Sequence, residues 1–393
     1  MKRFFLLLFL TLTVCISKSQ TYDDLQVSLL TVEPRSKAVY TIFGHTALRL
    51  YDPTRDIDAV LNWGTFDFDK PNFLWLFVKG ETDYFLSASP SAYFNYSYSQ
   101  GNSTVKEQIL NIPGEQKAAL MDYLSKNLEP ENIEYRYNFI FDNCTTRPRD
   151  IIEQFCGGNL TYPKQTEPVT FRELLHECTA PYPWVEFGID CIIGNGADSL
   201  ISRRSELFLP ALLMNALDKS VVKISDGSEY PIVLSTHTVM QSESDGKHTG
   251  SYLNLPLIIG FIIFLIYLTL IIIAYRNKRR FRGAFSLLFL IAGIGGCIVA
   301  IIGAISLHPC TWPNWNIIWL HPLHLIGFTG FLLKKSYPVI RWYHAVNFVI
   351  LSLLLLGWYW IPQQLNPASI PFSLCLWIVS GFQLLSYKKK LYE

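Results

Sequence analysis

The last third of the chain contains five apolar stretches, and these constrain the fold more than any other feature. Each is long enough, or nearly so, to cross a bilayer as a helix, which takes about 20 apolar residues. They lie at residues 254–275, 284–307, 316–333, 340–361 and 370–387. The sequence therefore predicts an all-α, five-helix transmembrane domain over residues 253–387, followed by a short tail over 388–393.

Basic residues alternate with uncharged turns between these stretches. Lysines and arginines cluster at 276–282, 334–341 and 388–390, whereas the turns 308–315 and 362–369 contain neither. Loops rich in lysine and arginine stay in the cytoplasm. The pattern therefore predicts a multi-pass protein whose N-terminal part is exported and whose C-terminus is cytoplasmic.

The N-terminus has the three-part layout of a secretory signal peptide. Lys2 and Arg3 precede an apolar run over 4–16, which is too short to span a bilayer. We expect cleavage near Ser19, so that residues 1–19 form the signal. A lipoprotein signal ending at Cys15 is disfavoured, because a valine precedes it where a small residue is expected.

Residues 20–220 have the patterns of a compact α+β domain. Segments 38–51 and 58–68 are rich in β-branched and aromatic residues and flank a turn, as in a β-hairpin. Residues 221–252 are polar, which predicts a linker to the membrane domain. Further strands are predicted at 82–87, 103–111 and 133–141, and helices at 114–128 and 145–155.

The cysteines and charges narrow the chemistry. An exported domain can form disulfides, but the sequence leaves their pairing open among Cys156, Cys178, Cys191 and Cys310. Lysine plus arginine number 33 and aspartate plus glutamate 32, so nothing indicates a nucleic-acid partner. The histidines lack metal-ligand spacing, and we expect neither a metal site nor a cofactor.

The stretch YRYNFIFDNCTTRPRD at 135–150 carries the strongest signal for catalysis. It runs from a predicted strand into a predicted helix with Pro148 in its first turn, where proline is tolerated. Cys144 therefore stands at a helix N-terminus, where the dipole and free N–H groups lower a thiol pKa and can bind an oxyanion. The alternative is a small buried cysteine at a strand–helix junction, the commoner case for a cysteine taken alone.

A second motif, FGHTALRL at 43–50, supplies a base. His45 lies in an alternating strand beside Gly44, which permits close approach of another group. A cysteine and a histidine together form the nucleophile and base of a papain-like enzyme, here with the chain order reversed. Several polar residues are candidates to orient or support this pair, and the choice stays open among Asn62, Thr65, Asp67 and Asn143.

These motifs strongly resemble the Lnb-type family of Bacteroides-like bacteria. The segments FGHTALRLYD, LNWGTFDFDKPNF and YRYNFIFDNCTTRPRDIIE carry the resemblance, which extends through PWVEFGIDCIIG at 183–194, LFLPALL at 207–213 and the apolar region. It implies a nucleophile at Cys144 and a base at His45. By wider analogy it implies the circularly permuted papain-like fold of the NlpC/P60 relatives and the lecithin:retinol acyltransferases. The expected location is the bacterial inner membrane, with the catalytic domain in the periplasm.

The family is associated with N-acylation of lipoproteins, so the resemblance implies an acyltransferase. A phospholipid would donate an acyl chain through a Cys144 thioester, and the α-amine of a diacylglyceryl-cysteine lipoprotein would accept it. Arg147 and Arg149 are candidates to bind a phosphate head group, and His321 and His324 to line a lipid entrance. Membrane helices suit an enzyme whose two substrates both reside in the bilayer.

Two other classes stay open at this stage. A cell-wall peptidase or amidase, or a thiol lipid hydrolase, would use the same cysteine and histidine, and a peptidase would act on muropeptides without lipid. A non-enzymatic membrane assembly factor would tolerate both Cys144→Ala and His45→Ala. The sequence defines neither the oligomeric state nor the preferred acyl donor.

Overall fold

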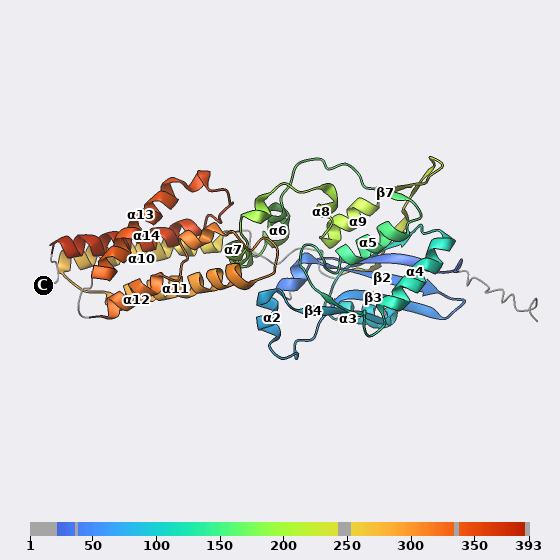
Figure 1. The fold of residues 1–393 in the computed structure, drawn as a ribbon, viewed down its shortest axis with the longest axis horizontal. Helices are drawn as coiled ribbons and strands as arrows, with labels where there is room; N and C mark the ends of the chain where they lie inside the picture. Colours follow the sequence, from blue (N-terminus) through green and yellow to red (C-terminus); the bar gives the residue numbers. More distant parts are fainter. Residues whose placement is uncertain (1–21, 36–37, 243–252, 334–337, 390–393) are drawn as a thin grey trace, which may run out of the picture.

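A mixed α/β domain and a helical domain follow one another along the chain and lie end to end (Figure 1). The computed structural model describes residues 22–35, 38–242, 253–333 and 338–389. The predicted signal peptide, 1–19, lies outside the described residues. The two domains meet where α6 (Phe171–Thr179) and α7 (Pro183–Ile192) face the ends of the long helices.

A seven-stranded antiparallel sheet organises the α/β domain, in the order β10-β5-β1-β2-β3-β4-β6. In the hairpin of β2 and β3, Leu48 lies opposite Leu61. Three short strands form a second sheet. The bounds are β1 (Gln26–Val32), β2 (His45–Asp52), β3 (Ile57–Thr65), β4 (Asp83–Pro90), β5 (Val105–Leu110), β6 (Glu134–Arg136), β7 (Asn159–Thr161), β8 (Val221–Lys223), β9 (Glu229–Pro231) and β10 (Val233–Met240).

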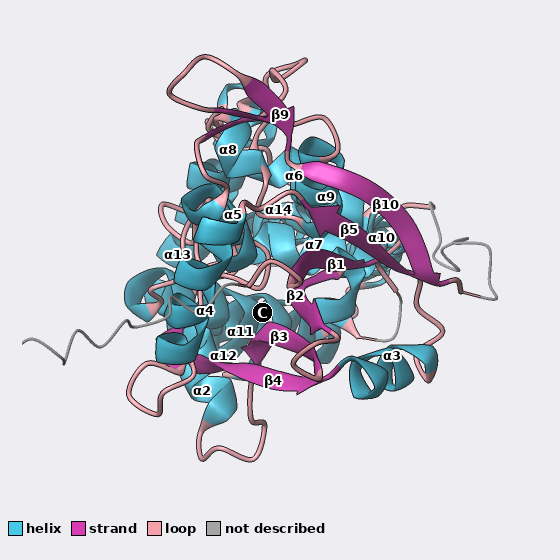
Figure 2. Cartoon of the chain, turned by 90° about the vertical axis from the view of Figure 1, so that its right-hand side faces the viewer, coloured by secondary structure: helices cyan, strands magenta, loops and turns pink. Residues whose placement is uncertain are grey.

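Helices cover both faces of the large sheet (Figure 2). Successive strand residues point to opposite faces, so Leu29 joins one core and Leu30 the other. The larger core packs the sheet against α4 (Gly114–Asn127), α5 (Thr146–Phe155) and α9 (Pro210–Leu217), and the smaller one packs it against α3 (Ser91–Ser99). This burial holds the start of α5 against the middle of the sheet.

Two predictions for the α/β domain differ from the structure. The strand expected from residue 38 begins only at His45, because a 3-10 helix, η1 (Val39–Phe43), precedes it and Gly44 turns the chain at φ +79°. Residues 221–240, expected in a linker, form β8, β9 and β10. β10 is an edge strand with one side in water, so many of its residues are polar. This polar composition does not indicate a strand that pairs with β5.

The helical domain contains four helices that are long and apolar enough to cross a membrane, counted over the described residues. The predicted count of five is not confirmed, because residues 316–333 do not form one helix. A 3-10 turn, η3 (Trp315–Ile318), is separated by Pro322 from the nine-residue α12 (His324–Leu332), and proline cannot continue the helical bonding. The long helices are α10 (Leu255–Asn277), α11 (Arg282–Ile305), α13 (Pro338–Leu356) and α14 (Ser369–Lys389).

Candidate functional site

The structure brings Cys144, His45 and Asn62 together from three elements. Cys144 directly precedes α5, His45 is the first residue of β2, and Asn62 lies in β3. His45 Nε2 lies 2.8 Å from Asn62 Oδ1, an atom that can only accept, so Nε2 carries a proton. The side chain of His45 is also hydrogen-bonded to the thiol of Cys144. This arrangement has the connectivity of a nucleophile, a base and a group that orients the base.

The pKa shifts of this partly buried pair favour its charged form. Burial raises the pKa of the Cys144 thiol, but the charge and hydrogen bond of His45, with bonds from the Thr46 backbone and the Thr145 hydroxyl, hold it below its ordinary value. Burial likewise lowers the pKa of His45, yet the Cys144 charge and the hydrogen bonds to Cys144 and Asn62 raise it above its ordinary value. Both shifts favour a thiolate beside an imidazolium, which is the nucleophilic state of a cysteine.

Asn143 fixes the turn that presents the thiol. Its Oδ1 accepts the N–H groups of Thr145 and Thr146 at 2.8 and 2.9 Å. Its Nδ2 donates to the carbonyls of Phe139 and Phe208. The N–H of Cys144 is not among the groups that Asn143 binds. Asn143 thus supports the backbone at the start of α5 and does not contact the imidazole.

Gly64 permits the close approach of the thiol and the imidazole. Its φ is +130°, and a Cβ there would lie 3.2 Å from Cys144 Cβ and 3.4 Å from His45 Cε1. Gly44, in contrast, lies against the carbonyl of Val32 rather than facing the site. Gly64 is a functional residue outside the predicted set, although an isolated glycine inside a strand is a signal of close approach.

The other two orienting candidates bind elsewhere. Thr65 Oγ1 lies 2.7 Å from Ser87 Oγ, and Asp67 Oδ1 accepts the N–H of Asp69 at 2.9 Å. Both residues follow Gly64, where the pairing of β3 with β4 shifts register. Among the three candidates of this segment, only Asn62 has a hydrogen bond to His45 in the described structure.

The two candidate arginines bind groups of the protein itself. Arg147 pairs with Asp142 at 2.6 Å and lies 3.6 Å from the centre of the Tyr135 ring. Arg149 is buried, pairs with Asp150 and donates to the carbonyl of Arg204. Both guanidinium groups therefore stabilise the surroundings of α5.

The two candidate histidines of the helical domain lie in an internal polar network. His324 is fully buried, with ring nitrogens 2.6 Å from the Tyr343 hydroxyl and 2.9 Å from the carbonyl of Trp319. The His321 ring stacks on His324 at 3.8 Å, and its Nε2 lies 3.3 Å from Asn347 Oδ1. These contacts join α12 to α13 within the bundle.

Four tyrosines, two of them buried and two partly buried, lie near the thiol, and no sequence motif indicates them. Burial is the largest effect that raises the pKa of each tyrosine, and the negative charge of Cys144 is the second. The pKa of Tyr84 rises to about 12. They remain protonated and can donate hydrogen bonds. Tyr135 Oη is buried without a partner among the described residues. The other three tyrosines of this group are Tyr84, Tyr98 and Tyr137.

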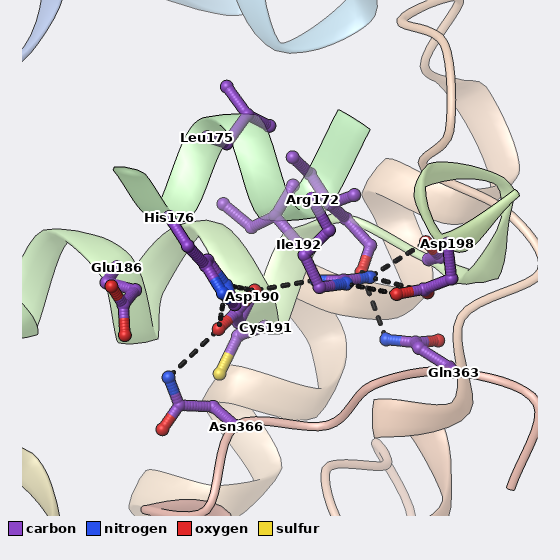
Figure 3. Close-up of polar contacts among 12 residues, drawn as sticks. Arg172, Leu175, His176, Glu186, Asp190, Cys191, Ile192, Asp198, Gln363 and Asn366 are labelled. Atoms are coloured by element: carbon purple, nitrogen blue, oxygen red, sulfur yellow. Dashed lines mark hydrogen bonds and ion pairs between the residues drawn. The ribbon is translucent and has the colours of Figure 1, made fainter. Parts of the chain in front are cut away.

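A second polar cluster lies at the junction of the two domains (Figure 3). The buried Arg172 pairs with Asp190 at 2.6 Å and with Asp198 at 2.7 Å. Asp190 also binds His176 and receives a hydrogen bond from Asn366 of the helical domain. The ligand atoms of His176, Glu186 and Asp190 lie within 4.8 Å of one another, a spacing that could hold a metal ion. Arg172 already neutralises Asp190, so this cluster fits an ion-pair network better than a metal site.

The cysteines that could have formed disulfides are free. All seven cysteines of the described residues have free thiols, including Cys156, Cys178, Cys191 and Cys310. Burial raises the pKa of Cys178 to about 11 and that of Cys191 to about 12. These thiols are therefore protonated, whereas the surroundings of Cys144 lower its pKa.

Comparison with known families gives two matches that together span most of the chain. Residues 16–177 match the model of the Lnb N-terminal periplasmic domain, and residues 248–390 match the model of the Lnb transmembrane domain. The first match contains His45, Asn62 and Cys144. A search of curated proteins and one of solved structures gave no match.

Proposed function

Because this chain belongs to the Lnb-type family, we propose that it is a lipoprotein N-acyltransferase. An acyl chain moves from a phospholipid to Cys144, and then to the α-amine of a diacylglyceryl-cysteine at a lipoprotein N-terminus. The observation that carries the proposal is the Cys144–His45 pair, oriented by Asn62 and with pKa shifts that favour its charged form, in a domain joined to membrane-spanning helices.

In the first half-reaction the Cys144 thiolate attacks an ester carbonyl of the phospholipid. A carbon–sulfur bond forms, and negative charge develops on the carbonyl oxygen. The N–H of Cys144 at the start of α5 and a hydroxyl of the nearby tyrosines are the donors for this oxyanion. The tetrahedral intermediate then collapses, and the glycerol oxygen leaves with the proton of His45. The products are a thioester and a lysophospholipid.

In the second half-reaction the α-amine of the lipoprotein attacks the thioester. Such an amine has an ordinary pKa near 8, so about a tenth of it is already neutral at pH 7. His45, now uncharged, takes the proton that the nitrogen loses as the amide bond forms. The carbon–sulfur bond breaks and restores the thiolate beside the imidazolium. No cofactor is needed, because the energy of the ester is retained in the thioester.

The architecture supports a permuted papain-like assignment for the α/β domain. The histidine on a strand precedes the cysteine at the start of a helix, and an asparagine from the next strand completes the set. The signal-like N-terminus and the basic turns support a periplasmic α/β domain, an inner-membrane helical domain and a cytoplasmic C-terminus. In this topology α12 is a fifth, partial membrane helix of about 14 Å.

The test is to look for the thioester on the intact protein. The full-length protein is incubated with phosphatidylethanolamine vesicles, and intact-mass analysis is expected to show one acyl adduct on Cys144. Cys144→Ser should lose the adduct, whereas the matched control Cys178→Ser, in the same domain, should keep it. The absence of an adduct from the wild-type protein would contradict the proposal.

Complementation separates this function from its rivals. In a strain that lacks N-acylation, the wild-type gene should restore triacylated lipoproteins, measured by mass spectrometry of a lipoprotein N-terminus, and Cys144→Ser should not. Restoration by the Cys144→Ser variant at normal expression would exclude the mechanism. Cleavage of muropeptides in the absence of lipid would instead identify a peptidase or amidase.

A further inference from the structure

Helix α2 (Phe73–Lys79) presents an unusually apolar surface. Its sequence is FLWLFVK, and none of its seven residues is buried. Leu74, Trp75 and Phe77 are 73%, 52% and 41% exposed, and Phe68 of the preceding loop is 63% exposed. We call these four residues the α2 face. Single exposed apolar residues are ordinary, but a group of this kind marks an interaction surface.

The α2 face lies beside the end of a membrane-spanning helix. α11 ends at Ile305, and directly afterwards the N–H of Leu307 donates to the carbonyl of Lys79 at 2.8 Å. The His308 Nε2 lies 2.6 Å from the carbonyl of Phe77, and the two rings are 5.4 Å apart. Figure 1 shows α2 projecting from the α/β domain at this junction. The helix is therefore level with the edge of the bilayer that α11 crosses.

The chemistry of this surface fits phospholipid. α2 contains no acidic residue, and its only charged residue, Lys79, pairs with Glu81. The turn after α11 continues the apolar surface with the exposed side chains of Leu307 and Trp312. Short segments rich in tryptophan, phenylalanine and leucine bind at the boundary of head groups and acyl chains. Continuity with a membrane-spanning helix thus selects the bilayer as the occupant.

A row of aromatic rings leads from the α2 face toward the thiol. Phe77 lies 6.4 Å from Phe73, Phe73 lies 5.5 Å from Phe66, and Phe66 lies 4.9 Å from Tyr84 between ring centres. Tyr84 is close enough to Cys144 for the thiolate charge to raise its pKa. Phe66 also follows Gly64 by two residues, and Gly64 abuts Cys144. The row thus connects the bilayer edge to the nucleophile.

We propose that the α2 face inserts into the adjoining leaflet of the bilayer and that Phe77, Phe73 and Phe66 guide a phospholipid acyl chain to Cys144. The insertion stands on the position and exposure of α2 alone. The guiding role rests on the proposed acyl transfer. Two experiments therefore address the two parts separately.

Photo-crosslinking tests insertion without reference to activity. The full-length protein, with Trp75→p-benzoylphenylalanine, is irradiated in phospholipid nanodiscs, and intact-mass analysis detects covalent lipid. The matched control carries the same group at Leu234, which is 61% exposed on β10, four strands away from β3. We expect lipid adducts at position 75 and none at position 234. No lipid adduct at position 75, or a covalent dimer of the chain in its place, would overturn the insertion.

Charge substitution tests the guiding role. In Phe77→Glu, acylation of Cys144 from bilayer phospholipid should fall at least about tenfold, because a carboxylate in the aromatic row opposes burial of an acyl chain beside it. Leu234→Glu should acylate at the wild-type rate, and iodoacetamide labelling of Cys144 should confirm a folded site in both. Wild-type acylation by Phe77→Glu would overturn the guiding role while the acyltransferase proposal stands. A wild-type protein that is never acylated would overturn both.

Discussion

At the scale of single residues, the Cys144–His45 pair separates this site from the other thiols of the chain. In the α/β domain, burial raises the pKa of Cys156, Cys178 and Cys191. The pKa of Cys144 is lowered despite the effect of burial. The difference comes from one neighbour, His45, and from donors at the start of α5. The nucleophile is therefore prepared before any substrate arrives.

The pH dependence of Cys144 alkylation should report this pair directly. Iodoacetamide reacts with the thiolate, so the rate rises with pH through the Cys144 pKa, which lies below the ordinary value. His45→Ala removes the stabilising charge and leaves the effect of burial, so the half-maximal rate should move to higher pH. At pH 7 the rate should fall about tenfold or more. Peptide mass spectrometry measures this, with Cys178 as the slow internal reference; an unchanged midpoint would contradict the ion pair.

Gly64→Ala should damage the site far more than a matched glycine substitution elsewhere. The new Cβ would press on Cys144 and His45, and φ +130° is unfavourable for alanine, at about 1–3 kcal/mol. We expect Cys144 alkylation and acylation both to fall. Gly188→Ala, on α7, meets no atom within 4 Å and should be neutral or stabilising. Equal activity of the two variants would show that the approach at Gly64 is not needed.

At the scale of elements, local patterns predicted much of the fold and non-local pairing accounts for the rest. The helical spacing of 114–128 corresponds to α4, Gly114–Asn127. The residues of β10 have the polar pattern of a linker, because their identity as a strand depends on β5, more than 120 residues earlier. The stretch 316–333 is apolar enough to span a bilayer, yet Pro322 and the side-chain contacts of Asn316 break it.

The site shows the same division. Two local motifs indicate Cys144 and His45. Which of Asn62, Thr65 and Asp67 lies beside His45 depends only on the register of β3. The irregular pairing at Gly64 sets that register, and one sequence does not reveal it. The tyrosines around the thiol come from β4, α3 and the region of β6, so only the folded chain brings them together.

Removal of the cap at the start of α5 should destabilise the α/β domain. Asn143→Ala deletes four hydrogen bonds in a buried turn, and a cap loss with unsatisfied partners costs about 2 kcal/mol. For a domain of this size the thermal midpoint should fall by about 4–8 °C. Asn215→Ala, exposed on α9, is the control and should shift it little. Circular dichroism of the full-length protein in detergent measures both, and equal midpoints would contradict the role of the cap.

At the scale of the whole molecule, the segment 183–198 joins the two domains through backbone and side-chain contacts. Asn314 of the helical domain donates to the carbonyls of Cys191 and Ile192, and Gln363 donates to that of Ile193. Arg172 holds the same segment from the other side, through Asp190 and the carbonyls of Ile193 and Gly194. The height of the thiol above the membrane is therefore set by a rigid junction.

Arg172→Met should loosen this junction. It leaves Asp190 and Asp198 without their shared cation, and breaking a buried pair costs about 3–5 kcal/mol. Hydrogen exchange of the Gly194 and Asn195 amides, which bind carbonyls of the helical domain, should accelerate. Arg204→Met, which removes a half-exposed arginine from its pairs with Asp150 and Glu153, should change exchange at the junction little. Unchanged protection in Arg172→Met would show that the network does not hold the domains.

Two bonds of the junction depend on no side chain at all. The N–H of Gly194 donates to the carbonyl of Cys310, and that of Asn195 to the carbonyl of Pro313. Main-chain bonds survive the exchange of one residue type for another, so homologues can diverge widely on both sides of the junction and keep the same angle between their domains. Gly194 is the exception, because a Cβ there would lie 2.1 Å from the Pro313 oxygen. Evolutionary drift across this surface should therefore spare one position, the glycine at 194.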